Sequence, residues 1–101
     1  MISKFGLSEV DNQKIKSIFF KHPEIEKVLI YGSRAKGNFK PSSDIDLTII
    51  TKKKDITFLF TVENEIDDLL LPYKVDLSIF DLLENESLKE HILRVGQIYY
   101  P

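Results

Sequence analysis

The sequence predicts an α/β fold, a small mixed β-sheet of about three to four strands with helices packed on it. Three short apolar stretches, at residues 27–31, 46–51 and 74–80, have the character of strands. Apolar residues at helical spacing precede the first stretch, separate the second from the third and follow the last. The chain has 101 residues, of which 43% are hydrophobic, so we expect residues 1–101 to form a single domain.

The first helix is predicted from a capping signal and a proline. Ser8 has the character of an N-cap, and Asp11 stands three residues later as a weaker form of the capping box. The helix is expected to stop at His22, because Pro23 disfavours the α conformation in the residue before it. The strand at residues 27–31 then follows.

Later elements continue this alternation. Residues 56–71 carry apolar groups at helical spacing, and Pro72 is expected to end that helix. After the third strand, the capping-box pattern of Ser87 and Glu90 predicts the start of the last helix, and Gly96 is typical of its C-cap. Interleaved strands and helices of this kind favour helices packed on a sheet.

Two segments each have two interpretations. Residues 32–45 connect the first two strands either by a short helix or by an irregular loop. The aromatic residues near position 100, in the segment 98–101, either belong to a partner surface or fold back on the core.

Charge and composition exclude several functions. Fourteen Lys and Arg face sixteen Asp and Glu, so the net charge is -2, and no global field favours nucleic acid or an anionic membrane. The absence of cysteine excludes disulfides and thiolate metal sites. The N-terminus shows no signal-peptide pattern and no apolar run reaches membrane length, so we expect a cytoplasmic protein.

The pair Asp44 and Asp46 is the first candidate for chemistry. If both lie on the second strand, they point to the same face, with Cα atoms roughly 6.6 Å apart. Two carboxylates this close repel each other unless a cation lies between them. Mg²⁺ typically takes one or two carboxylates while phosphates supply other ligands, so the pair predicts a magnesium site.

Asp76 is the second candidate. In the third strand, alternation sends Asp76 and Ser78 to one face and the apolar residues to the other. If this strand lies beside the second, Asp76 completes a cluster of three carboxylates, which could hold two metal ions about 4 Å apart. Alone, Asp76 could equally be a charge that protects an edge strand from aggregation.

Asp44 and Asp46 lie near the C-terminal end of the stretch GSRAKGNFKPSSDIDL, residues 32–47. The N-terminal end of this stretch has the character of a phosphate site. Gly32 directly follows a strand, and without a Cβ its backbone can approach a ligand closely. Ser33 offers a hydroxyl and a backbone N–H, while Arg34, Lys36 and Lys40 supply local positive charge. A Gly-Ser turn or an Asp-Ile-Asp alone is usually an ordinary turn or strand edge, but their joint order and spacing favour a site.

This stretch, followed by a strand that contains VDL, resembles the nucleotidyltransferase superfamily of DNA polymerase beta, and the short chain is similar to its minimal branch. The resemblance implies a nucleotidyltransferase fold like the polymerase beta palm. It implies that Gly32 and Ser33 hold a triphosphate and that Asp44 and Asp46 bind Mg²⁺. Asp76 would be the third carboxylate, binding metal and helping to activate the attacking hydroxyl.

Three further residues complete the nucleotide-binding set that the resemblance implies: Arg34, Lys36 and Ser43. Lys36 stands where arginine is common in the family motif, which exchanges a bidentate fork for a point charge. The family transfers a nucleoside monophosphate from a nucleoside triphosphate to a hydroxyl and releases pyrophosphate, a reaction that depends on positioning and charge neutralisation.

Minimal members of this family are often paired with a helical HEPN protein in a toxin–antitoxin module, in which the small protein is the antitoxin. The resemblance therefore implies a Mg²⁺-dependent enzyme, with two ions, that places AMP from ATP, or another NTP, on a hydroxyl of such a partner. A homo- or hetero-oligomer is compatible with the sequence.

Two alternatives remain open. The protein could neutralise a toxin by contact without turnover, or it could modify a small molecule in the manner of aminoglycoside nucleotidyltransferases. The short chain argues against the small-molecule alternative, because a deep acceptor pocket usually needs more wall. A nucleic-acid polymerase is disfavoured by the net charge.

Overall fold

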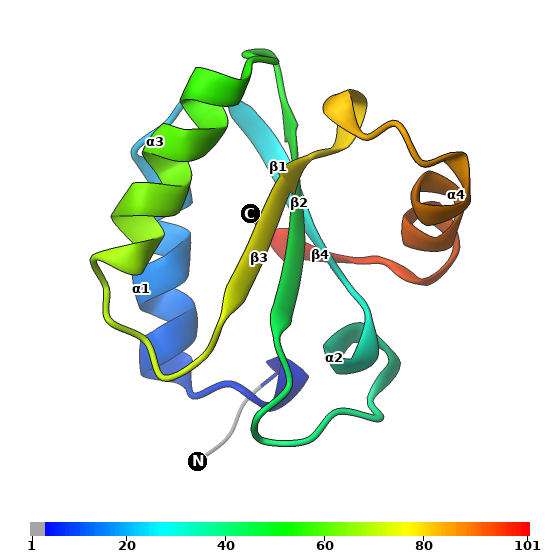
Figure 1. The fold of residues 1–101 in the computed structure, drawn as a ribbon. Helices are drawn as coiled ribbons and strands as arrows, with labels where there is room; N and C mark the ends of the chain where they lie inside the picture. Colours follow the sequence, from blue (N-terminus) through cyan, green and yellow to red (C-terminus); the bar gives the residue numbers. More distant parts are fainter. Residues whose placement is uncertain (1–3) are drawn as a thin grey trace.

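The computed structural model describes residues 4–101 as a mixed four-stranded sheet with helices on both faces (Figure 1). The α/β class predicted from the sequence is confirmed. Residues 1–3 begin the N-terminal stretch in which no signal peptide is expected, and they lie outside the described residues.

The strands of the sheet follow the order β3-β2-β1-β4. Their bounds are β1 (Ile25–Tyr31), β2 (Ile45–Thr51), β3 (Val75–Ile79) and β4 (Gln97–Tyr100). β1 pairs antiparallel with both β2 and β4, whereas β2 and β3 are parallel. A parallel pair needs a crossover connection, and a helix between the two strands provides it.

Helices flank the sheet in two layers. Their bounds, with two short 3-10 turns, are η1 (Lys4–Gly6), α1 (Glu9–Phe20), α2 (Ser33–Lys36), α3 (Ile56–Asp67), η2 (Phe80–Leu82) and α4 (Glu86–Val95). Figure 1 shows α1 and α3 covering one face, while α2 and α4 lie on the other. None of the helices formed by residues 4–101 has the length and apolar character that crossing a membrane requires.

Capping explains where the two large helices begin. The Ser8 side chain accepts a hydrogen bond from the Asp11 N–H at 3.1 Å, which confirms the predicted start of α1. In α3, the Asp55 side chain accepts from the Phe58 N–H at 2.7 Å. α1 ends at Phe20, shortly before the predicted stop.

Two predicted helix ends are wrong. α3 stops at Asp67, well before Pro72, and the chain then turns through Leu70 at φ 53°, a left-handed conformation that no helix continues. The start of α4 is set by Asn85, whose side chain accepts from the Leu88 N–H at 3.1 Å, instead of by Ser87.

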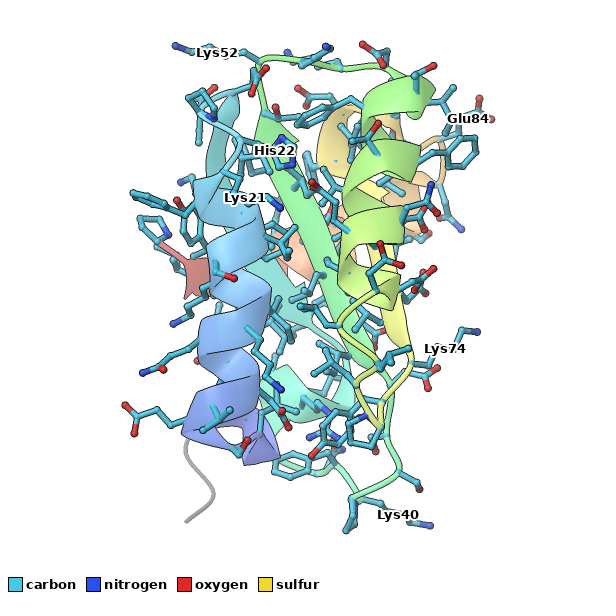
Figure 2. All side chains as sticks on the ribbon, turned by 90° about the vertical axis from the view of Figure 1, so that its left-hand side faces the viewer. Lys21, His22, Lys40, Lys52, Lys74 and Glu84 are labelled. Carbon is cyan, nitrogen blue, oxygen red and sulfur yellow. The ribbon has the colours of Figure 1, made fainter. Side chains whose placement is uncertain are left out.

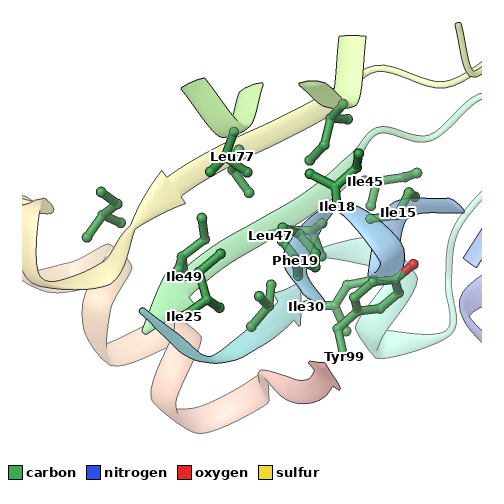
Figure 3. Close-up of a cluster of buried hydrophobic side chains, with 14 of the residues drawn as sticks. Ile15, Ile18, Phe19, Ile25, Ile30, Ile45, Leu47, Ile49, Leu77 and Tyr99 are labelled. Atoms are coloured by element: carbon green, nitrogen blue, oxygen red, sulfur yellow. The ribbon is translucent and has the colours of Figure 1, made fainter. Parts of the chain in front are cut away.

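The hydrophobic core lies between the sheet and the α1–α3 layer. In β2, Ile45, Leu47 and Ile49 are fully buried, and Figure 3 shows them beside Ile15 and Phe19 of α1. Because side chains alternate along a strand, the residues between them face the opposite side of the sheet. This alternation directs polar groups of β2 to the face on which α2 and α4 lie.

The strand β4 was not predicted, and it settles the two interpretations of segment 98–101. Tyr99 is 2% exposed, and its hydroxyl donates to the Asn12 side-chain oxygen at 2.7 Å on α1. Ile98 points the other way and is 61% exposed. The segment therefore folds back on the core through alternate side chains.

Candidate active site

Three strand ends meet at one end of the sheet. β1 ends at Tyr31, and β2 and β3 begin at Ile45 and Val75. Since β1 is antiparallel to β2 and β2 is parallel to β3, these three ends lie together, next to α2 (Figure 1). The segments that carry the predicted site residues are thereby gathered at a single end of the molecule.

A row of three residues crosses the sheet at this end. Tyr31 is the register partner of Asp46, and Asp46 is the register partner of Asp76. Register partners point to the same face, and neighbouring strands lie about 4.8 Å apart. The structure thus places Asp46 and Asp76 side by side, although they belong to different βα units.

Asp46 is the electrostatic centre of the row. Its pKa is raised by burial first, and then by the negative charges of Asp76 and Asp44, while Lys74 opposes the shift. Asp46 is half-buried, whereas Asp44, which precedes β2, and Asp76 are exposed. Within residues 4–101, no hydrogen-bond donor contacts the Asp46 carboxylate.

These carboxylates fit a divalent cation in their chemistry. Hard oxygen donors are the ligands that Mg²⁺ prefers, and a cation would relieve the mutual repulsion that raises the Asp46 pKa. In the part of the chain that the structure describes, no three His, Cys, Asp or Glu side chains converge into a complete metal-binding group. The predicted three-carboxylate metal site therefore remains a prediction, and further ligands would have to come from a bound nucleotide.

Gly32 lies directly against Asp46. Its backbone has φ 75°, and a Cβ added at this position would lie 2.3 Å from Asp46 Oδ2. Only glycine fits such a close approach without displacing the carboxylate. The strand-to-helix turn therefore packs against the carboxylate and leaves no room for a side chain at position 32.

The connection after Gly32 is a short helix followed by a loop, so both interpretations of it hold in part. α2 begins at Ser33, and its single turn closes when the Gly37 N–H donates to the Ser33 carbonyl at 2.9 Å. Lys36 and Lys40 are exposed, and Figure 2 shows Lys40 at the same end of the molecule as Lys74.

Arg34 contacts the protein itself through its guanidinium group. The side chain is 2% exposed, and its Nε and Nη2 donate to the Ser43 carbonyl at 3.1 and 2.9 Å. Nη1 donates to the Phe5 carbonyl at 2.8 Å, and Nη2 also donates to the Pro41 carbonyl at 3.2 Å. The sequence predicts that Arg34 contacts phosphate. The guanidinium N–H groups that such a contact needs donate to backbone carbonyl oxygens in this structure.

Aromatic rings complete the surroundings of Arg34. Its guanidinium carbon lies 5.1 Å from the ring centres of both Phe39 and Tyr73. The Ser43 side chain accepts from the Lys40 N–H at 2.8 Å. Arg34 and Ser43 thus hold the loop that carries Asp44, a role that the sequence did not reveal because it depends on how residues 37–44 fold.

Tyr31 is the residue of this row that sequence reasoning missed. It is 8% exposed, and burial raises the pKa of its phenol, followed by the charges of Asp76 and Asp46, while a hydrogen bond with Ser78 lowers it. Ser78 donates to Thr48 Oγ1 at 2.8 Å. The available signal was its position directly before Gly32 at the end of a strand.

A comparison with protein families decides the identification. The model of the family described as Polymerase beta, Nucleotidyltransferase matches residues 13–101. The chain belongs to this nucleotidyltransferase family. No curated protein matches it.

Solved structures share the fold of this nucleotidyltransferase. A crystal structure of a toxin–antitoxin with AMP-PNP has a TM-score of 0.72 at 19% identity, covering 88% of this chain and 72% of that one. A tri-AMPylated Shewanella oneidensis HEPN toxin in complex with MNT antitoxin gives 0.67 at 16% identity, with coverages of 91% and 71%. A putative nucleotidyltransferase from Sulfolobus solfataricus gives 0.57 at 19% identity, with coverages of 89% and 76%.

The nucleotidyltransferase site has two flanks. Gly32 and Ser33 lie on the β1–α2 flank of Asp46, and Asp76 lies on the β3 flank. In-line displacement at phosphorus requires the attacking and leaving oxygens on opposite sides. The arrangement therefore suits a triphosphate on one flank and an acceptor hydroxyl on the other.

Proposed function

We propose that this nucleotidyltransferase transfers AMP from ATP to a hydroxyl of a HEPN-type partner protein, depends on Mg²⁺, and acts as the antitoxin of a toxin–antitoxin pair. The observation that carries the proposal is the register of Asp46 with Asp76 beside the close approach of Gly32. The fold shared with an MNT antitoxin in complex with an AMPylated HEPN toxin supports the choice of partner.

The carboxylates Asp44, Asp46 and Asp76 would hold the metal. Bound Mg²⁺ would neutralise phosphate charge and favour departure of pyrophosphate. A bond forms between the acceptor oxygen and the α-phosphorus, and the bond from that phosphorus to the bridging oxygen breaks. Pyrophosphate leaves with the electron pair, and Asp76, exposed on the outer strand, accepts the hydroxyl proton.

The β1–α2 flank would bind the triphosphate. Gly32 lets the backbone approach the phosphates, and the Ser33 hydroxyl and N–H are available to donate to them. The exposed Lys36 contributes positive charge to the same flank. Arg34 and Ser43 contribute by fixing the loop before Asp44.

A second candidate function is neutralisation of the toxin by contact without transfer. The observation in its favour is that the carboxylates of residues 4–101 form no complete three-ligand group before a nucleotide arrives. A protein that only binds its partner has no need of one.

A transfer assay separates these two functions. The protein is incubated with ATP labelled at the α-phosphate, Mg²⁺ and the product of the neighbouring gene as the candidate HEPN-type partner. The proposal predicts label on the partner, and its loss with Asp46→Asn or Asp76→Asn but not with the exposed control Glu84→Gln. Stable complex formation without any labelling by the wild-type protein would favour contact alone.

A further inference from the structure

An open groove of about 480 Å³ lies on the β3 flank, between the C-terminal half of α3, the connection 68–74 and the start of β3. The side chains that matter here are those of Glu63, Asp67, Leu70, Lys74 and Val75. Figure 2 shows Lys74 beside the end of α3, opposite the end of the molecule that carries Glu84. A volume of this size lies within the range of ligand-binding clefts, about 300–1,000 Å³.

The groove adjoins Asp76. Val75, which lines it, precedes Asp76 in β3, the outer strand of the sheet, so the groove and the Asp76 side chain lie on the two faces of that edge strand. The negative charge of Asp76 also acts on Glu63. Burial is the largest cause that raises the pKa of Glu63, followed by the charges of Asp67 and Asp76. Asp76 is therefore close enough to Glu63 to act on it across the outer strand, and Lys74 adds one positive charge to the groove.

The position of the groove matches the approach of an acceptor. Asp46 stands between Gly32 on β1's side and Asp76 on β3. If the triphosphate lies on the Gly32 flank, pyrophosphate leaves toward that flank. Because the attacking and leaving oxygens lie in line with the phosphorus, the acceptor hydroxyl then approaches from the β3 flank. The groove is a hollow on that flank.

The charges of the groove indicate what fits it. Glu63 and Asp67 are four residues apart on α3, where like charges repel, and neither forms an ion pair with any cation of residues 4–101. A basic side chain would satisfy both carboxylates. Leu70 stands at the rim with φ 53° and is 88% exposed, which offers an apolar contact beside the acidic pair.

We propose that this groove binds a segment of the acceptor protein in which an arginine or lysine lies close to the hydroxyl that is modified. The basic side chain enters between Glu63 and Asp67, and an apolar neighbour packs on Leu70 and Val75. This inference rests on the proposed function, because it assigns the acceptor side of the same site. The groove therefore recognises a basic side chain of the partner that lies close to the hydroxyl that is modified.

The first test is a charge-neutral double variant, Glu63→Gln with Asp67→Asn. We expect affinity for the proposed HEPN-type partner to fall about tenfold or more, while Mg²⁺-dependent binding of AMP-PNP stays within about twofold. The matched control, Glu26→Gln with Glu84→Gln, changes the net charge equally at exposed positions and keeps partner affinity. Equal affinity of the double variant and wild type would overturn the proposal.

A second test locates the partner segment. A photoreactive amino acid replaces Leu70, which is exposed enough to tolerate it, and the cross-linked partner peptide is sequenced. We expect a peptide with Arg or Lys within a few residues of the AMP-bearing hydroxyl. Cross-links only to partner segments remote from that hydroxyl would contradict the proposal.

These outcomes are distinct from failure of the proposed function. If the wild-type protein transfers no label, the transfer hypothesis fails, and partner affinity of the double variant still tests the groove. If label is transferred and the double variant keeps the wild-type KM for the partner, the groove assignment alone fails. Labelling of an aminoglycoside that is lost in the double variant would make the groove a small-molecule site and overturn the protein-segment proposal.

Discussion

Asp46 and Asp76 are direct register partners across the parallel strands β2 and β3, although thirty positions separate them in the chain. The half-buried member of this pair, Asp46, has a raised pKa because burial and the charges of Asp76 and Asp44 all disfavour its ionised form. The site therefore holds a carboxylate in a state that costs stability and that a cation would relieve.

Replacing Asp46 tests this conflict between stability and function. A carboxyl whose folded-state pKa is raised stabilises the fold at pH values below its unfolded pKa and loses that stabilisation as the pH rises through the folded value. At neutral pH, Asp46→Asn should therefore raise Tm slightly while it weakens Mg²⁺-dependent nucleotide binding. Thermal melts with and without Mg²⁺ and nucleotide measure both effects. Unchanged nucleotide affinity would contradict the metal assignment.

Gly32→Ala should remove nucleotide binding. The new Cβ would lie 2.3 Å from Asp46 Oδ2, and the backbone at φ 75° is unfavourable for alanine. Gly37→Ala is the matched control, because Gly37 has φ 88° but no heavy atom within 4 Å of the place that a Cβ would take. Gly37→Ala should lose about 1 kcal/mol from backbone strain. Gly32→Ala should lose more, because ψ -156° at positive φ is essentially restricted to glycine, and it alone should lose nucleotide affinity as well. Equal nucleotide affinities of the two variants would show that the close approach to Asp46 is unimportant.

Arg34→Lys should destabilise the fold whether or not nucleotide is present. A lysine keeps the charge but cannot serve the three carbonyl groups and two rings that the guanidinium contacts. Urea unfolding should show a loss of about 2–4 kcal/mol, because buried carbonyls are left without donors. The neighbouring control, Lys36→Ala, is exposed and should unfold like the wild type. A stable Arg34→Lys variant with weak ATP binding would instead indicate a direct phosphate contact.

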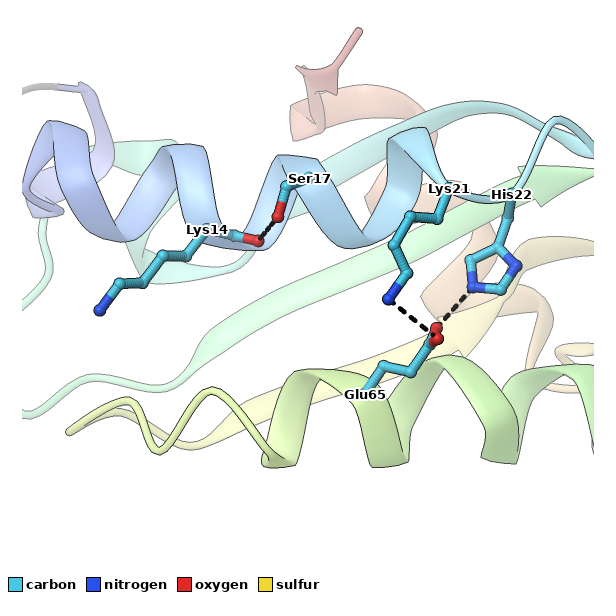
Figure 4. A network of polar contacts seen from close by, with 5 residues as sticks. All are labelled: Lys14, Ser17, Lys21, His22 and Glu65. Atoms are coloured by element: carbon cyan, nitrogen blue, oxygen red, sulfur yellow. Dashed lines mark hydrogen bonds and ion pairs between the residues drawn. The ribbon is translucent and has the colours of Figure 1, made fainter.

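A pH effect is expected from the contact between α1 and α3. Figure 4 shows Glu65 of α3 between His22 and Lys21, with Lys21 Nζ 3.3 Å from a Glu65 oxygen. The hydrogen bond with His22 is the main cause that lowers the pKa of Glu65. Its stabilisation is present above the unfolded pKa and is lost as the pH falls through the lowered folded value.

We therefore expect the wild type to lose more stability than Glu65→Gln when the pH is lowered from neutral into the range below 4.5, the ordinary value for a glutamate. Thermal melts across this range provide the measurement. Glu84→Gln, at an exposed position without an ion pair among residues 4–101, should keep the wild-type pH dependence. Parallel curves for wild type and Glu65→Gln would rule out this network as a source of pH-dependent stability.

The pairing of Asp46 with Asp76 in the row could be predicted because it follows from local rules, whereas Tyr31 was missed. Alternation along two strands directs Asp46 and Asp76 away from the buried faces, and the interleaving of strands with α3 makes their strands neighbours. The close approach of Gly32 follows from a glycine directly after a strand. Each of these features depends on spacing that is visible in the chain.

Other features depend on contacts between distant segments. The donors of Arg34 reach carbonyls of Phe5 and of the loop before Asp44, so a basic residue in a basic stretch gave no sign of this role. α3 ends early, and the chain then passes through Leu70 at φ 53°. A leucine in the sequence does not predict a left-handed backbone conformation. β4 is four residues long and is defined by pairing with β1, which its own sequence does not specify.

The most direct measurement is the intact mass of the proposed HEPN-type partner after incubation with this protein, ATP and Mg²⁺. We predict a gain of one AMP for each modified hydroxyl with the wild-type protein and with the exposed control Glu84→Gln, and none with Asp76→Asn. An unmodified partner after incubation with the wild-type protein, or equal modification by Asp76→Asn, would contradict the account.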